Sequence, residues 1–157
     1  MLSKKAKYGL KALVALAREY PNGRLLIADL AGQERIPRKF LELILLDLKN
    51  HGLLHSRRGR GGGYALGKAP SEIAIGLVIR ELDGPLAPMS CVSHTAYHRC
   101  EECVDERTCG IRAVMAEVRE ATARVLDHTS LAQMVEHEVR LERTTRSVGR
   151  AAKRRDP

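Results

Sequence analysis

Residues 25–54, LLIADLAGQERIPRKFLELILLDLKNHGLL, carry apolar residues at helical spacing on both sides of a short break. We expect one helix over residues 27–33 and a second over residues 37–50. Pro37 suits the first position of the second helix, where its missing backbone N–H leaves no hydrogen bond unmade. Two helices joined by so short a turn form a helix-turn-helix. A first helix, which Ser3 is placed to cap, precedes them.

A glycine-rich hairpin is predicted directly after the second helix. Residues 53–57 and 64–66 have the composition of short strands, and RGRGG forms the tip between them. The glycines allow tight turns and the close approach of a partner. We interpret the hairpin as a wing beside the helix-turn-helix. The alternative, a loop around a nucleotide phosphate, lacks the lysine-serine pair and the strand–loop–helix order of a P-loop.

Charge is divided unevenly along the chain. Residues 1–70 carry 14 Lys and Arg against 5 Asp and Glu, residues 71–139 carry 6 against 12, and residues 140–157 carry 7 against 2. A basic first half is typical of a surface that binds nucleic acid, and the acidic middle should point away from phosphates. The alternative is that these Lys and Arg residues only solvate helices.

The second helix of the helix-turn-helix has one charged face. At about 100° per residue, Arg38, Lys39, Glu42 and Lys49 fall on that face, and apolar residues fill the other side. We expect Arg38 or Lys39 to donate to guanine or phosphate, and Glu42 to accept from cytosine N4. Glu42 has an alternative role as the ion-pair partner of Arg38, one turn away.

The wing supplies a second set of expected DNA contacts, with its arginines entering the minor groove. The full set of expected wing contacts is Arg57, Arg58, Arg60, Gly61, Gly62 and Tyr64.

All four cysteines lie in one polar loop with the spacing C-x8-C-x2-C-x5-C. Cys91, Cys100, Cys103 and Cys109 could together ligate a [2Fe–2S] or [4Fe–4S] cluster, or three of them could do so with Cys100 as a spare or exchange ligand. Zinc is an alternative, with the loop's two histidines as further ligands. A third possibility is a set of reversible disulfides.

Helices are predicted on both sides of this loop. Ser71 is placed to cap the preceding one, and a helix over residues 110–127 follows, with an apolar stripe at i, i+3, i+4 and i+7 that needs a cover. Ser130 and Gln133 form a capping box for a last helix. The basic segment 143–157 has almost no apolar residues and is expected to be unstructured.

Residues 1–127 resemble the Rrf-two family of bacterial winged-helix regulators. The resemblance rests on KKAKYGLKALVALA, on IPRKFLELILLDLKNHGLLHSRRGRGGGYAL, in which SRRGRGGGYAL is most specific, and on ELDGPL before a cysteine loop. It implies a homodimer that crosses through the helix after the loop and binds operator DNA as a repressor or activator. It also implies a cluster, held by three cysteines and a fourth group, that senses iron–sulfur status, nitric oxide, iron or redox state.

The chain departs from the family pattern in three respects. The spacing upstream of Cys103 is longer, and Cys100 is an extra cysteine. Leu46 and Asp47 stand where the family's recognition helix is often polar or basic. The basic tail lies outside the resemblance.

Together these patterns predict a mainly α protein with a winged helix-turn-helix domain (1–84), a cysteine-rich loop (85–109), a dimerisation helix with a C-terminal helix (110–142) and a basic tail (143–157). We expect a cytoplasmic homodimeric repressor that binds a palindromic operator under the control of an iron–sulfur cluster. The alternative is a zinc-stapled or thiol-switch regulator without a cluster. No apolar run is long enough for a membrane span. No catalytic triad or carboxylate pair indicates an enzyme.

Overall fold

The computed structural model describes residues 2–153 and their side chains as far as Thr145. Its elements are α1 (Lys4–Arg18), α2 (Ile27–Glu34), α3 (Arg38–Asn50), β1 (Leu54–Arg57), β2 (Gly63–Leu66), α4 (Ile75–Asp83), α5 (Gly110–Asp127) and α6 (Leu131–Lys153). Two short 3-10 turns lie at Pro70–Glu72 and Ser90–Val92. The expected mainly α fold with a two-stranded wing is confirmed.

Helices α1 to α4 pack around one apolar core. Its largest fully buried side chains are Leu13, Leu16, Leu30, Leu41, Ile44, Leu45, Leu48, Leu53, Leu54, Ile73, Ile75 and Leu131. Burying one such side chain stabilises the fold by roughly 1.5–3 kcal/mol. Leu131 belongs to α6, so the start of that helix is docked on the same core. Tyr8 and Phe40 add an edge-to-face ring contact between α1 and α3, with centroids 5.8 Å apart.

The turn between α2 and α3 fixes the helix-turn-helix. Arg35 ends α2 in the left-handed region (φ 54°, ψ 47°), and the buried Ile36 donates its backbone N–H to Ala31 at 3.0 Å. Pro37 is the N-cap of α3, one residue before the position predicted for it. Its carbonyl accepts the first helical hydrogen bonds, from Phe40 and Leu41.

The wing is an antiparallel pair in which Leu54 faces Leu66 and Arg57 faces Gly63. Tyr64 also exchanges two backbone hydrogen bonds with Leu25, at 3.0 and 2.9 Å, so the chain before α2 acts as a third, minimal strand. Gly63 has φ +125°, and a Cβ there would lie 2.5 Å from the Leu25 carbonyl oxygen. Only glycine allows this close approach.

Polar side chains cap the N-terminal ends of α1 and α6. The Ser3 hydroxyl accepts from the Ala6 backbone N–H at 3.1 Å, as predicted. The capping box at α6 is also present, with Ser130 N–H donating to Gln133 at 2.8 Å and Gln133 N–H donating to the Ser130 hydroxyl at 3.2 Å. The predicted Ser71 cap is wrong. Residues 70–72 form the 3-10 turn instead, and α4 begins only at Ile75.

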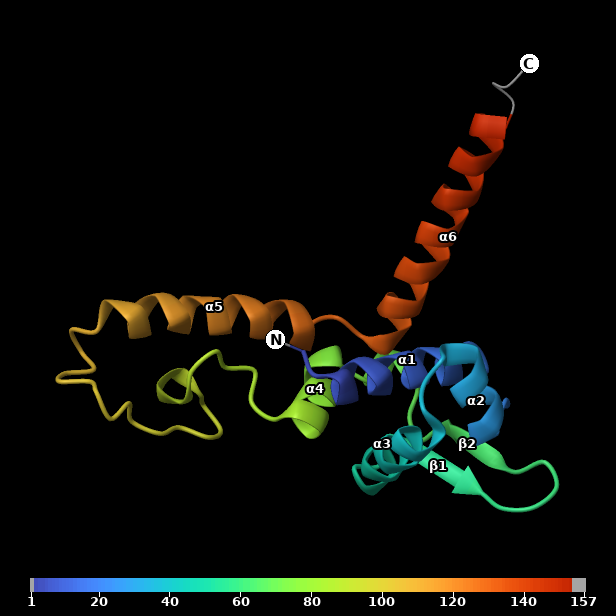
Figure 1. The fold of residues 1–157 in the computed structure, drawn as a ribbon, viewed down its shortest axis with the longest axis horizontal. Helices are drawn as coiled ribbons and strands as arrows, with labels where there is room; N and C mark the ends of the chain where they lie inside the picture. Colours follow the sequence, from blue (N-terminus) through green and yellow to red (C-terminus); the bar gives the residue numbers. More distant parts are fainter. Residues whose placement is uncertain (1, 154–157) are drawn as a thin grey trace.

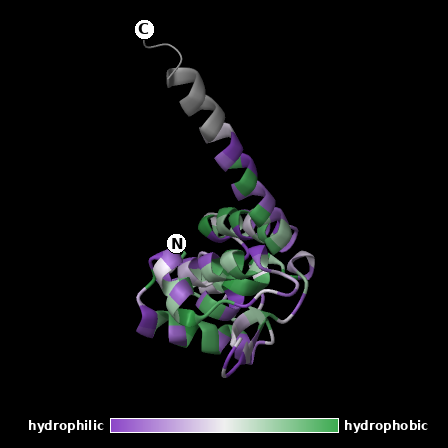
Figure 2. Ribbon diagram, turned by 90° about the vertical axis from the view of Figure 1, so that its right-hand side faces the viewer, coloured by the Kyte–Doolittle hydropathy of each residue, from purple (hydrophilic) through white to green (hydrophobic). Residues whose placement is uncertain are grey.

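Helix α5 extends from the body of the molecule, with the cysteine loop running beside it, and α6 leaves in a different direction (Figure 1). No residue of α5 is buried. Apolar and polar residues alternate along the described part of α6 (Figure 2). Arg18 of α1 holds this helix through ion pairs with Glu138 at 2.5 Å and Glu142 at 3.9 Å.

Helix α6 continues to Lys153, whereas the sequence prediction left residues 143–157 unstructured. The hydroxyls of Thr144 and Thr145 donate to carbonyls four residues earlier, at 3.1 and 2.9 Å, so these polar side chains are accommodated within the helix. The Ala and Arg residues of this segment have high helix propensity. Residues 154–157 lie outside the described part. No described helix is long and apolar enough to cross a membrane.

Candidate functional site

One face of α3 is exposed and carries the four charged residues singled out in the sequence: Arg38, Lys39, Glu42 and Lys49. The opposite face is buried through Leu41, Ile44, Leu45 and Leu48. The Arg38 guanidinium lies 3.3 Å from the Glu42 carboxylate, so the ion pair that the sequence offered as an alternative for Glu42 is formed. Asp47, at the edge of this face, is paired with Lys5 of α1 at 2.7 Å.

The wing lies beside α3, on the side of the domain away from α6 (Figure 1). Arg57, Arg58, Arg60 and Gly61 are exposed at its tip. Gly62 is instead buried in the turn, where a Cβ would lie 2.4 Å from the Arg57 carbonyl oxygen.

Tyr64, the last of the predicted wing contacts, is half-buried against the core, and its backbone is paired with Leu25. Gly62 and Tyr64 therefore shape the wing from inside, whereas the arginines face outward.

The cations of α3 and the wing have few acidic neighbours. Within residues 2–145, Lys39, Lys49, Arg57, Arg58 and Arg60 form no ion pair. Unpaired cations gathered on one side of a domain favour binding of a polyanion.

The cysteine loop brings all four thiols to the wall of one cavity of about 310 Å³. Its lining residues are Met89, Cys91, Cys100, Glu102, Cys103, Glu106, Cys109, Ile111 and Arg112. The Cys109 sulfur caps α5 by accepting from the Arg112 N–H at 3.4 Å. The Arg112 guanidinium donates to the Cys91 carbonyl at 3.2 Å and so connects the two ends of the loop.

Two of the thiols in this cavity, Cys100 and Cys103, have a raised pKa. Burial, followed by the nearby Cys109 thiol, raises the pKa of Cys103 above its ordinary value. The Cys100 thiol donates to the Glu102 carboxylate at 3.2 Å, and this hydrogen bond raises the pKa of Cys100. Converting several of these thiols to thiolates together requires a compensating positive charge, such as that of metal ions.

The donor set has soft metal-ligand chemistry, but the thiols surround a space instead of converging on a point. Within the side chains described, no group of three or more His, Cys, Asp or Glu residues is placed to hold one metal ion. Of the two loop histidines, His94 faces away from the cysteine cavity. His98 lies in a neighbouring depression beside Cys91 and Cys100.

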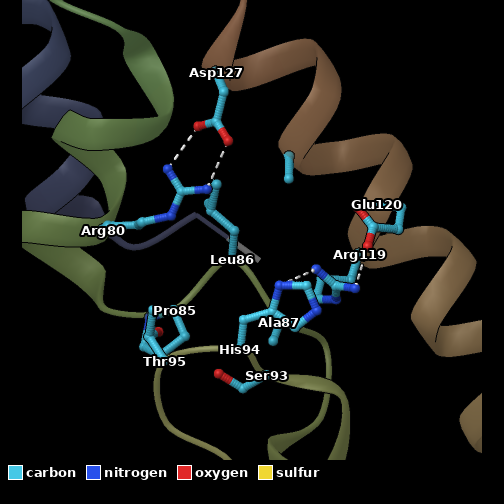
Figure 3. Close-up of a pocket in the computed structure, with 11 residues that line it drawn as sticks. Arg80, Pro85, Leu86, Ala87, Ser93, His94, Thr95, Arg119, Glu120 and Asp127 are labelled. Carbon is cyan, nitrogen blue, oxygen red and sulfur yellow. Dashed lines mark hydrogen bonds and ion pairs between the residues drawn. The ribbon is translucent and has the colours of Figure 1, made fainter.

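A second cavity, of about 510 Å³, lies between the end of α4, residues 85–95 and α5 (Figure 3). Arg80 of α4 donates to both carboxylate oxygens of Asp127 in α5, at 2.6 and 2.8 Å. This hydrogen bonding holds the pKa of Asp127 below its ordinary value.

On the opposite wall, Arg119 is only 11% exposed. It donates to His94 Nδ1 at 3.1 Å and to Glu120, while its buried Nε has no hydrogen-bond partner among the described residues. Sequence reasoning missed these contacts because Arg80 and Asp127, like Arg119 and His94, are distant in the chain and form no motif.

The apolar stripe of α5 is uncovered. Ile111, Val114, Val118 and Val125 are all exposed, with Ile111 at 65% and Val125 at 62%. At about 100° per residue, this stripe lies about 110° around α5 from Arg119. Ile111 at its start also lines the cysteine cavity, whereas the valines of the stripe are exposed.

Comparison with known proteins identifies the family. The sequence profile of the Rrf2 family, described as an iron-dependent transcriptional regulator, matches residues 2–137. This chain belongs to the Rrf2 family. Members of the Rrf2 family are transcriptional regulators and not enzymes, so this protein is a DNA-binding regulator of transcription.

Relatives of known sequence and structure cover most of this Rrf2 protein. It is 44% identical over 139 residues to an rrf2-like HTH-type transcriptional regulator of Rhodobacter capsulatus. The matched region covers 86% of this chain and 92% of that protein. The structure of CymR, the global cysteine regulator of B. subtilis, superposes with a TM-score of 0.73 at 31% identity, over 87% of this chain and 97% of that one. IscR of T. potens superposes with a TM-score of 0.70 at 26% identity, over 88% of each chain.

Proposed function

We propose that this Rrf2 protein is a homodimeric repressor whose affinity for a palindromic operator is controlled by an iron–sulfur cluster. Cys91, Cys100, Cys103 and Cys109 would hold the cluster. The observation that carries the proposal is the convergence of all four thiols on one cavity at the start of α5. The proposal places a sensor of redox state, iron or nitric oxide between the DNA-binding domain and the dimerisation helix.

The arrangement of sulfurs favours a cluster over a single zinc ion. Zinc needs four ligand atoms about 2.0–2.3 Å from one centre, and within the described side chains no such group exists. A cluster would take its cysteine ligands on more than one iron atom, so Cys91, Cys100, Cys103 and Cys109 spread around a cavity could hold it. His94, an additional ligand in the zinc interpretation, is bound to Arg119 on the other side of the loop.

Two surfaces support the DNA-binding and dimeric parts of the proposal. Helix α3 and the wing, which carry the exposed cations, lie beside each other on the side away from α6 (Figure 1). This arrangement suits α3 in a major groove and the wing against the adjacent groove. The uncovered stripe of α5 suits the same stripe of a second copy, because an apolar face of this size is normally buried in a partner. A two-fold axis through α5 would produce two α3 helices matched to a palindrome.

The contacts around α5 suggest how the loop and the DNA-binding domain are coupled. When bound, the cluster would supply redox chemistry and the positive charge that keeps four thiolates together. Arg112 and Cys109 fix the start of α5 to the loop, and Arg80 and Asp127 fix its end to α4. Ordering of the loop therefore sets the angle of α5, and this angle sets the spacing of the two α3 helices.

The proposal is tested by the ultraviolet–visible spectrum of anaerobically purified protein, with iron, sulfide and zinc assayed in the same sample. We expect broad absorbance near about 400 nm with matching iron and sulfide, which Cys103→Ser should abolish. Ser93→Ala, in the same loop but outside the cysteine cavity, is the matched control. If the protein is colourless and contains stoichiometric zinc, the loop holds a structural zinc ion and the cluster proposal is wrong.

A thiol switch is the second candidate. The Cys103 and Cys109 thiols line the same cavity. Oxidation of two thiols to a disulfide releases two electrons and two protons to an oxidant such as a peroxide. A colourless, metal-free protein whose operator affinity changes with peroxide and recovers with a dithiol would favour this candidate.

A further inference from the structure

Two leucines stand on the exposed face of α3. Leu43 is 60% exposed and Leu46 is 50% exposed. They are three residues apart, so they are neighbours on one side of the helix. Neither packs against the buried core. A single exposed leucine needs no explanation, but two adjacent ones beside the exposed cations of the same helix indicate a contact.

The surroundings of the two leucines identify the partner. Lys39 and Lys49 are exposed on the same helix, and the wing, which carries three exposed arginines, lies beside α3 (Figure 1). A second copy of this face would bring identical cations against them and would be repelled. Duplex DNA offers the opposite charge, so charge complementarity selects DNA.

The acidic groups beside the leucines are already neutralised within the chain. Glu42 is paired with Arg38 at 3.3 Å, and Asp47 is paired with Lys5 at 2.7 Å. The middle of the α3 face therefore presents apolar surface to whatever it meets. In the major groove the apolar group at the base edges is the C5-methyl of thymine.

We propose that Leu43 and Leu46 read thymine methyl groups in the major groove and so set part of the operator sequence. This inference rests on the proposed placement of α3 in that groove. Lys39, Lys49 and the wing hold the phosphates, and the two leucines distinguish thymine from the other bases. Apolar contact of this kind requires no hydrogen bond, which explains why the centre of the α3 face can be leucine instead of a polar side chain.

The test compares thymine with deoxyuridine, which lacks only the C5-methyl. Duplexes are first selected from a randomised pool with the wild-type protein, and each preferred thymine is then replaced in turn by deoxyuridine. We expect one or two replacements to weaken binding about fourfold each, the effect of withholding one methyl from an apolar contact. With Leu46→Ala or Leu43→Ala, sensitivity at the corresponding position should fall below about twofold.

Two further variants separate a local contact from a general defect. Leu46→Met keeps an apolar side chain and should keep the sensitivity to deoxyuridine. Leu77→Ala removes a partly exposed leucine of α4, outside the α3 face, and should behave as wild type. Circular dichroism confirms that each variant is folded.

The outcomes distinguish this inference from the function on which it rests. If no duplex is enriched, both are wrong. If a duplex is enriched but contains no preferred thymine, or deoxyuridine is tolerated throughout, only the methyl contact is wrong. The methyl contact is also contradicted if the Leu43→Ala and Leu46→Ala proteins both retain full sensitivity to deoxyuridine at every position.

Discussion

Arg80 and Asp127 form a two-pronged ion pair, at 2.6 and 2.8 Å, between α4 of the DNA-binding domain and the last turn of α5. The residues are 47 positions apart in the chain. Bidentate Arg–carboxylate pairs fix orientation as well as distance. This pair is therefore the main polar constraint on the angle at which α5 leaves the domain.

We predict that Asp127→Asn lowers stability only above acidic pH. The folded-state pKa of Asp127 is depressed by Arg80, so its contribution is present above the unfolded pKa of about 3.9 and is lost as pH falls through the folded value. Because both side chains are about one-third exposed, we expect less than about 1 kcal/mol, or about 2–4 °C in Tm at pH 7.

Thermal unfolding at pH 7 and again in the acid range measures this effect. Asp29→Asn, at a carboxylate without an ion pair among the described residues, is the control. An equal loss of stability at both pH values would show that the pair does not titrate as described.

Gly76→Ala should break the same junction from the other side. A Cβ at Gly76 would lie 2.0 Å from the Asp127 carboxylate and 3.0 Å from the Arg80 guanidinium. These atoms must move, but alanine adds up to about 1 kcal/mol of helix propensity to α4. The two effects nearly cancel, so we expect little change in Tm and a several-fold change in operator affinity. An unchanged operator affinity would show that the Arg80–Asp127 junction does not couple the cysteine loop to the DNA-binding domain.

Arg58→Ala should weaken operator binding and reduce the slope of log K against log salt by about 1. The reason is that Arg58 is an exposed wing cation with no ion pair among the described residues. Arg124→Ala, which removes an exposed cation of α5, should leave the slope unchanged. Fluorescence anisotropy at several salt concentrations measures both; an unaltered slope for Arg58→Ala would remove the wing from the DNA interface.

Val118→Glu should convert the proposed homodimer to a monomer. It places a charge in the uncovered stripe of α5, and burying an unpaired carboxylate costs several kcal/mol. Ala113→Glu, on the other side of α5, is the matched control and should remain dimeric. Sedimentation velocity reads the outcome directly, and a dimeric Val118→Glu protein would place the interface elsewhere.

The local chemistry of individual residues predicted the element boundaries best. Ser3, Ser130 and Gln133 were identified from capping rules, and the bounds of α5 agree with the helix predicted over residues 110–127. The Ser71 cap failed because residues 70–72 close a 3-10 turn on Glu72 instead.

Features that depend on distant contacts were not predictable from the sequence. Nothing near Arg80 or Asp127 indicates a partner 47 residues away. Leu46 stands out in the sequence as an apolar residue at a position that is often polar, but only the packing of α3 shows that both Leu43 and Leu46 are exposed. The convergence of the cysteines was predictable from their spacing, but the distribution of their sulfurs around a cavity required the fold of the loop.

The most direct test of cluster-controlled DNA binding is the Kd for a selected operator, measured anaerobically with the purified protein before and after removal of its iron and sulfide, and with the Cys103→Ala, Cys109→Ala double variant. We expect the cluster-free protein and the double variant to share one Kd that differs at least tenfold from that of the cluster-bound protein, a difference of about 1.4 kcal/mol. One Kd for all three would contradict control by a cluster and leave a DNA-binding protein whose cysteine loop does not govern its operator.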